Sequence, residues 1–229
     1  MRMVLLAIAV IVAAGLVACG GDEGKTAEPL TLEQRLLRES EVPGSKADPV
    51  EVRLTARSLD EFTAWGEDYV AAAEVDRRKY EAAGFVSAVH DTRFIPNTPG
   101  GAHTRDAPHV RMLVLQFESE DGAVTGADLL HMNGIKPCPG QCAMQIEEFE
   151  VSGVPDATGV RRLLTAERLK ATGLEGEPSD SYTIWFADGL FAYQVESFAP
   201  EGGEVSEKRI EEIAEKVYER VKSAPPAAT

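Results

Sequence analysis

The segment from Ser181 to Phe198 constrains the fold most, because it reads as a β-hairpin with one apolar face. Asp188 and Gly189, at its centre, form a favoured two-residue hairpin turn. This turn predicts three apolar cross-strand pairs on one face: Phe186 with Phe191, Ile184 with Tyr193, and Tyr182 with Val195. A face of six apolar side chains has to be covered, so the hairpin predicts a sheet packed against a helix.

The last helix of the chain is the predicted cover. Ser206 is a suitable N-cap residue, and apolar residues then recur at helical spacing. They are Ile210, Ile213, Ala214, Val217 and Val221. This spacing places all five on one side of a helix that ends near residue 222.

Earlier segments predict further strands and helices. Ser58 and Glu61 are spaced as a capping box, which predicts a helix running to Gly84. Alternating or continuous apolar runs predict strands over 50–56, 85–95, 109–118 and 143–151, the last with a bulge or twist near Glu147. Helices are predicted over 119–132, ended by Asn133-Gly134, and, in an ambiguous stretch, over 159–169.

Together these elements predict an α+β fold: one domain over 31–222, with an antiparallel sheet covered by helices. The order strand, strand, helix can be read twice, ending near residues 132 and 222. No sequence repeat accompanies this order.

The first 19 residues predict export. Arg2 is followed by 16 uncharged residues from Met3 to Ala18, fewer than the about 20 needed to span a bilayer. A run of this length is typical of a secretory signal peptide. The alternative is an uncleaved N-terminal membrane helix.

Leu16-Val17-Ala18-Cys19 resembles the lipobox of bacterial lipoproteins. The resemblance implies cleavage before Cys19 and lipid attachment to its sulfur. We therefore expect a signal peptide over 1–18, a lipidated tether over 19–30 and a disordered tail over 223–229. The expected location is the extracytoplasmic face of the cell membrane, or the outer membrane in a Gram-negative host.

The composition excludes nucleic acid as a partner. Lys and Arg total 23 against 38 Asp and Glu, a formal net charge of −15. So acidic a chain repels phosphate backbones and anionic lipid headgroups. Contact with the membrane is therefore expected through the lipid on Cys19 and not through a basic patch.

Cys138 and Cys142 lie in the segment KPCPGQC. Two neighbouring thiols outside the cytoplasm normally oxidise, which predicts a disulfide. The spacing C-P-x-x-C also resembles the motif of extracytoplasmic copper-delivery proteins. That alternative adds His131 and Met144 as ligands, since sulfur and imidazole suit Cu(I).

The mature chain resembles uncharacterised envelope lipoproteins of actinobacteria. The shared phrases are LLRESEVPG, LQFESEDGA, GVPDA and WFADGLFAYQV. The resemblance implies a surface-anchored domain without an assigned reaction.

No catalytic motif accompanies these phrases, so we predict no catalytic residues, no cofactor and no resident metal. The expected function is non-enzymatic binding of an envelope protein or a small molecule. Four aromatic residues can line a pocket or fill the core: Trp65, Tyr69, Trp185 and Tyr193. Two alternatives stay open, a copper or thiol-redox lipoprotein and an enzyme with an unrecognised site.

Overall fold

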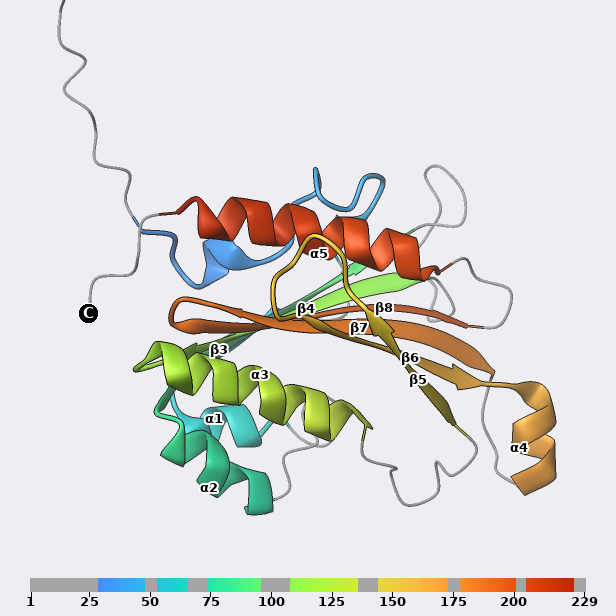
Figure 1. Ribbon diagram of the computed structural model, residues 1–229, viewed down its shortest axis with the longest axis horizontal. Helices are drawn as coiled ribbons and strands as arrows, with labels where there is room; N and C mark the ends of the chain where they lie inside the picture. The colour runs from blue at the N-terminus through green and yellow to red at the C-terminus, as the bar shows by residue number, and fades with distance from the viewer. Residues whose placement is uncertain are drawn as a thin grey trace, which may run out of the picture.

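A computed structural model describes residues 29–47, 53–65, 74–95, 108–135, 144–172, 178–200 and 205–224. Within these residues the chain forms one antiparallel sheet of eight strands, with helices on both faces (Figure 1). The strand order is β1-β3-β4-β8-β7-β6-β5, and β2 also pairs with β3. The predicted α+β fold with a helix-covered antiparallel sheet is confirmed.

The strands are β1 Lys46–Ala47, β2 Leu54–Ala56, β3 Phe85–Phe94, β4 His109–Phe117, β5 Gln145–Glu150, β6 Thr158–Leu164, β7 Ser179–Asp188 and β8 Phe191–Pro200. The α-helices are α1 Leu59–Thr63, α2 Glu74–Ala82, α3 Glu120–Ile135, α4 Ala166–Thr172 and α5 Glu207–Lys222. A short 3-10 helix, η1, covers Glu33–Arg35.

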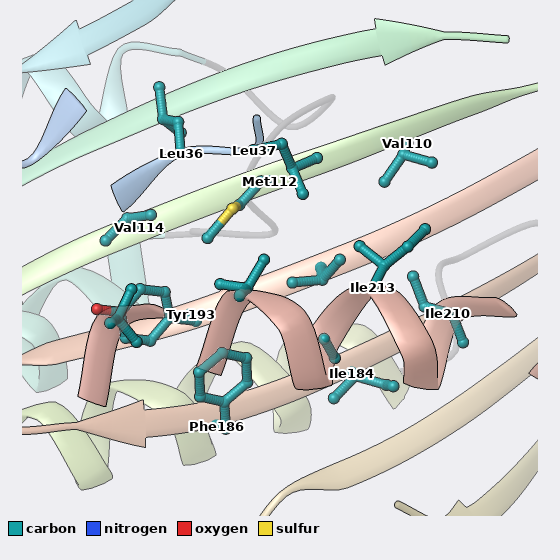
Figure 2. Close-up of a cluster of buried hydrophobic side chains, with 14 of the residues drawn as sticks. Leu36, Leu37, Val110, Met112, Val114, Ile184, Phe186, Tyr193, Ile210 and Ile213 are labelled. Carbon is teal, nitrogen blue, oxygen red and sulfur yellow. The ribbon is translucent and has the colours of Figure 1, made fainter. Parts of the chain in front are cut away.

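Each face of the sheet buries its own apolar core. On one face, called the α5 face, α5 lies over β7 and β8; Figure 2 shows Ile210 and Ile213 of this helix near Ile184 of β7. On the other, called the α3 face, α1, α2 and α3 cover residues such as Leu113 and Leu115 of β4. Burial on both faces explains why the central strands read as nearly continuous apolar runs.

The predicted hairpin face is confirmed, but its register is wrong by two residues. The observed pairs include Asp188 with Phe191 and Phe186 with Tyr193, so Gly189 and Leu190 form the turn. Gly189 has a φ of 56°, the positive value required at the first central position of a type II′ turn. A shift of two keeps every side chain on its face, and the six apolar side chains all join the α5-face core.

The capping predictions at residues 58 and 206 are confirmed. Ser58 Oγ accepts from the backbone N–H of Glu61 at 3.2 Å, and Ser206 Oγ accepts from that of Arg209 at 3.3 Å. The five apolar positions of α5 are all buried. The helix predicted to start at Ser58 is described as α1 and α2, and residues 66–73 between them lie outside the described residues.

Two local predictions are wrong, and a third is narrowed. Residues 158–164 form strand β6 where a helix was expected, because β5 and β7 pair with it on both sides. Of the bulge or twist expected near Glu147, the bulge is absent, because the register between β5 and β6 is continuous. Helix α3 continues through Asn133 and Gly134 to Ile135.

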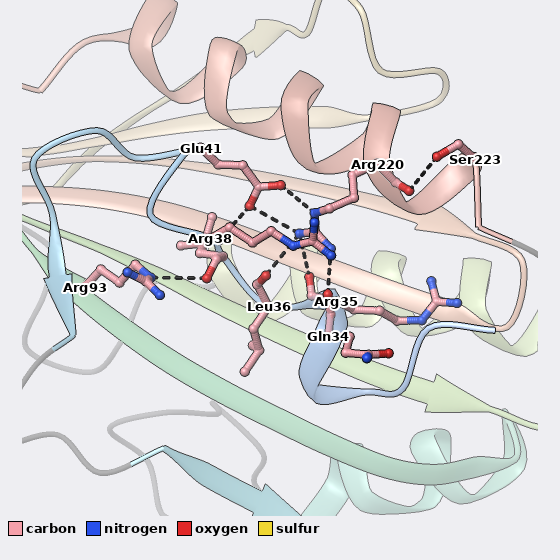
Figure 3. Close-up of polar contacts among 9 residues, drawn as sticks. Gln34, Arg35, Leu36, Arg38, Glu41, Arg93, Arg220 and Ser223 are labelled. Carbon is pink, nitrogen blue, oxygen red and sulfur yellow. Dashed lines mark hydrogen bonds and ion pairs between the residues drawn. The ribbon is translucent and has the colours of Figure 1, made fainter. Parts of the chain in front are cut away.

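Residues 29–45, called the N-terminal strap, complete the core on the α5 face. Leu36, Leu37 and Val42 are buried in the same core as the apolar residues of α5. Arg220 of α5 donates to the carbonyl oxygens of residues 34, 35 and 36 at 2.7–3.1 Å and to both carboxylate oxygens of Glu41 (Figure 3). The start of the chain's packed region is thus held by its last helix.

The order strand, strand, helix does occur twice, as β3-β4-α3 and β7-β8-α5. The two helices, however, lie on opposite faces of the sheet (Figure 1). A twofold axis perpendicular to the sheet would place both helices on the same face. The two halves are therefore not symmetric copies.

Candidate functional site

Four side chains on the α3 face of the two central strands lie beyond the apolar residues that α3 covers, and three of the four are polar. We call them the central block: His109 and Arg111 of β4, with Glu196 and Phe198 of β8. His109 pairs with Phe198, and Arg111 pairs with Glu196. Directly paired side chains share a face of the sheet and lie about 4.5–5.5 Å apart at their Cβ atoms, so the four form a compact square.

Two members of the central block are aromatic and stacked. The ring centroids of His109 and Phe198 are 4.8 Å apart, with an angle of 24° between the ring planes. The stacked rings lie directly beside the charged pair Arg111 and Glu196 in the strand register.

The charged members include Glu196, whose carboxylate forms an ion pair with Arg162. Arg162 of β6 lies with Nη1 3.3 Å from Glu196 Oε1, and the two side chains are each 15% exposed. Arg111 faces Glu196 from the other side in the strand register. Because water screens a partly buried ion pair only weakly, the attraction between Glu196 and Arg162 is stronger than that of an exposed pair.

Arg162 also joins the end of α3 to the sheet. Its Nε donates to the carbonyl oxygen of Gly134 at 2.8 Å, and its Nη1 donates to Thr183 Oγ1 at 3.1 Å. A side chain at position 134 would bring a Cβ to 2.5 Å from Trp185 and 2.6 Å from Arg162. Glycine is required here because only its bare backbone fits between the two side chains.

Trp185 separates the central block from the apolar core under α3. Its Nε1 donates to Gln194 Oε1 at 2.9 Å, and its ring lies 5.6 Å from the Arg162 guanidinium. His131 of α3 contacts the same ring, with centroids 5.2 Å apart. Helix α3 ends beside Trp185 and Arg162. The apolar contacts between α3 and the sheet therefore stop where the polar side chains of the sheet begin.

The central block combines a guanidinium, a carboxylate and a stacked pair of rings. Its carboxylate is paired with Arg162. Among the described residues, no group of three or more His, Cys, Asp or Glu side chains is placed to hold a metal ion.

Most of the site residues predicted from sequence lie outside the described residues: Cys19, Cys138 and Cys142. His131 lies in the last turns of α3, and Met144 directly precedes β5. These positions flank the segment that holds the two cysteines.

The aromatic residues proposed as a pocket do not gather at one place. Trp185 belongs to the α3-face core, whereas Tyr193 belongs to the α5-face core. Trp65 packs against Phe62, with ring centroids 5.3 Å apart, and Tyr69 is outside the described residues. Burial raises the pKa of Tyr193 far above its usual value, as expected for a core residue.

The sequence reading missed Arg111, Arg162 and Glu196. A signal was present in VRMLVLQF and YQVESF, where a charged residue interrupts an otherwise apolar strand. Such a residue in a central strand has to be paired or functional, because burying an isolated charge is costly.

None of the helices in the described parts of the chain is long and apolar enough to cross a membrane.

No family model matches the chain, and no curated protein matches it. Two solved structures are similar in fold. The extracellular domain of PknH from Mycobacterium tuberculosis is 13% identical, with a TM-score of 0.51 over 85% of this chain and 98% of that domain. An uncharacterised protein from Mycobacterium smegmatis is 9% identical, with a TM-score of 0.42 over 87% of this chain and 99% of that one. The first similarity shows a shared fold.

Proposed function

We propose that this protein is a lipid-anchored, non-enzymatic binding domain on the extracytoplasmic face of a bacterial membrane. The observation that carries the proposal is the lipobox Leu16-Val17-Ala18-Cys19 after a charged n-region and an apolar run. A cleaved and acylated Cys19 would hold the domain at the bilayer, since two acyl chains anchor stably where one is marginal.

The start of the N-terminal strap fits this anchoring. Leu30 packs against the α5-face core, and it lies eleven positions after Cys19. An extended chain of that length reaches about 36–40 Å. The domain would therefore stay close to the membrane, while its net negative charge keeps it off anionic headgroups.

Two further observations support an extracytoplasmic binding role. The fold is shared with the extracellular domain of a kinase, which is itself a module outside the membrane. The central block brings charged and aromatic side chains together on one face of the sheet. Sites with a few polar groups among aromatic ones are typical of small-molecule binding.

The anchor is tested by intact mass spectrometry of protein purified from membranes of the native host. We expect a mature chain that begins at Cys19 and carries acyl mass. Cys19→Ala should release the protein from the membrane fraction, whereas the matched variant Cys138→Ala should stay membrane-bound. A wild-type protein that retains Met1 and carries no acyl mass would overturn the proposal.

We also propose that Cys138 and Cys142 form a disulfide in the exported protein. Reduction should then raise the intact mass by two hydrogens and make both thiols available to an alkylating reagent. Free thiols in protein isolated under non-reducing, thiol-blocking conditions would contradict this proposal.

A copper or thiol-redox role for the same cysteines is the second candidate. His131 Nε2 is buried, and the described residues offer it no hydrogen-bond partner, which leaves open the atom that a metal would take. Titration of the reduced protein with Cu(I) tests the idea, with Cys138→Ser/Cys142→Ser as the control. Stoichiometric binding that the double variant abolishes would favour it, and its absence would exclude it.

A further inference from the structure

We propose that strand β5 is a docking edge, to which a partner protein adds a basic, extended segment as a further strand of the sheet. The inference rests on the proposed binding function and names the surface and the chemistry of the partner. It starts from the backbone of β5, because recognition by strand addition uses main-chain hydrogen bonds and needs no cavity.

Strand β5 forms one end of the sheet (Figure 1). Its six residues, Gln145–Glu150, pair in continuous antiparallel register with residues 158–163 of β6. Among the described residues no other strand pairs with β5, and the described turns and loops make no backbone hydrogen bond to it. Every second residue of such an edge strand directs its backbone N–H and C=O away from the sheet, where an added strand can pair with them.

The opposite edge of the sheet is protected, whereas β5 is not. At that edge β1 and β2, which are two and three residues long, both pair with β3. Short edge strands, lysine, proline and bulges all hinder the addition of a strand. Strand β5 has the sequence QIEEFE, with neither lysine nor proline, and its register with β6 contains no bulge. An extended segment can therefore pair along its whole length.

The side chains of β5 select the charge of that segment. Glu147, Glu148 and Glu150 are all exposed. Glu147 lies 3.7 Å from Nη1 of Arg161, but that guanidinium is closer to Asp180, at 2.9 Å. The other two glutamates have no ion-pair partner in the described parts of the chain. Three glutamates in six residues repel an acidic strand and attract a basic one.

The same charges disfavour a second copy of this chain as the occupant. Paired antiparallel over their full length, two β5 strands would place Glu147 of one copy opposite Glu148 of the second copy. Like charges directly opposite each other destabilise a strand pair. The net charge of −15 on each copy adds to this repulsion. The edge therefore fits a partner rich in lysine or arginine.

The two faces of β5 set the pattern of the bound segment. Ile146 pairs with Arg162, which contacts helix α3, so residues 146, 148 and 150 lie on the α3 face. Phe149, on the other face, packs against the α5-face core. An antiparallel segment that complements residues 150 to 146 in turn has the order basic, apolar, basic, basic, apolar from its N-terminus.

The test measures binding of labelled peptides to the full chain by fluorescence anisotropy. The probe is an acetylated peptide, Thr-Lys-Val-Lys-Lys-Val-Thr. Two matched peptides are the controls. One has glutamate in place of each lysine, and the other has proline in place of each valine, which keeps the charge but hinders strand pairing. We expect saturable binding of the probe and binding at least about tenfold weaker for both controls.

Hydrogen exchange locates the bound probe. Amides of β5 that face away from the sheet should exchange more slowly when the probe is bound, because they then donate to its backbone. Amides of β2, at the opposite edge, should be unaffected. Slowed exchange elsewhere and not in β5 would overturn the assignment.

Charge reversal then tests the role of the glutamates. Glu148→Lys/Glu150→Lys should weaken the probe by about tenfold or more, since it places lysines opposite lysines. Glu39→Lys/Glu81→Lys changes the net charge equally at two exposed positions outside the sheet, and should leave binding within about twofold. If the first double variant does not fold, Glu148→Gln, which keeps the shape of the side chain, should still weaken the probe.

Failure of this inference is distinct from failure of the anchor. Equal binding of the probe and either control peptide, or equal binding by wild type and the folded charge-reversal variant, would overturn it. A stable dimer in light scattering that the charge reversal alters would also overturn it, because the edge would then belong to a second copy. None of these results bears on the Cys19 acylation experiment.

Discussion

Arg220 and Glu41 form a two-point ion pair between the last helix and the N-terminal strap, with Nε 2.5 Å from Oε1 and Nη2 3.2 Å from Oε2. The side chains are 12% and 7% exposed, so the pair is largely removed from water. Arg220 also donates to three strap carbonyl groups. A guanidinium with its five donors is suited to such a junction, and an ammonium is not.

Arg220→Ala should lower the free energy of unfolding by about 3 kcal/mol, because it leaves the buried Glu41 carboxylate without its partner. Urea unfolding followed by tryptophan fluorescence measures the change. Arg78→Ala, an exposed arginine of α2, is the control and should cost less than about 0.5 kcal/mol. Equal stability of the two variants would show that the pair contributes nothing.

Tyr193→Phe should destabilise the protein by about 1–3 kcal/mol through a single lost hydroxyl. Arg35 is 2% exposed, donates from Nη1 to Tyr193 Oη at 2.7 Å and lies 3.6 Å above the Phe191 ring. Without the hydroxyl, a buried guanidinium donor loses its acceptor. Tyr218→Phe, at a partly buried ring of α5, is the matched control, and the same thermal or urea unfolding assay compares the two.

Gly134→Ala should cost about 1–3 kcal/mol, because its Cβ would overlap Trp185 and Arg162 at 2.5 and 2.6 Å. An exposed glycine inside a helix would instead gain stability on replacement by alanine. Val124→Ala, on the exposed side of α3, is expected to be nearly neutral. A stabilised Gly134→Ala protein would mean that α3 ends further from the sheet than described.

Asp188→Asn should raise stability near neutral pH, because burial raises the pKa of Asp188 above its ordinary value of 3.8 despite the opposing charge of Arg35. A carboxyl with a raised folded-state pKa contributes most below its unfolded pKa, and this contribution is lost as the pH rises through the folded value. The gain at pH 7 should be about 0.5 kcal/mol after solvent screening, and should vanish below pH 3.8. Unfolding at several pH values, with Asp128→Asn as the exposed control, measures it; a gain that persists at low pH would contradict the cause.

Elements that depend on local chemistry were predictable from the sequence. The five apolar positions of α5 and the caps Ser58 and Ser206 follow from spacing within a few residues. The apolar face of the hairpin was predictable, but the turn was not. The turns Asp188-Gly189 and Gly189-Leu190 leave the same side chains on the same face, so the pattern of apolar residues does not distinguish them.

Features that depend on distant partners were not predictable. The sequence around Arg35 is typical of a surface residue, and its hydrogen-bond acceptor, the Tyr193 hydroxyl, lies 158 positions later in the chain. Residues 159–164 form a strand because β5 and β7 flank them, and Gly159 leaves room for the ring of Phe149. The central block joins β4 and β8, whose pairing no local pattern specifies.

The N-terminal strap and the end of α5 meet at one pole of the domain, where Arg220 contacts Gln34 (Figure 3). A reporter fused after residue 224 would thus lie close to the N-terminal strap. The turn between β7 and β8 is also a poor position for a fused reporter, because Leu190 packs against the α5-face core. Immobilisation or labelling is better attempted through a cysteine introduced at the exposed position 128 of α3. This position leaves both ends of the described chain unmodified.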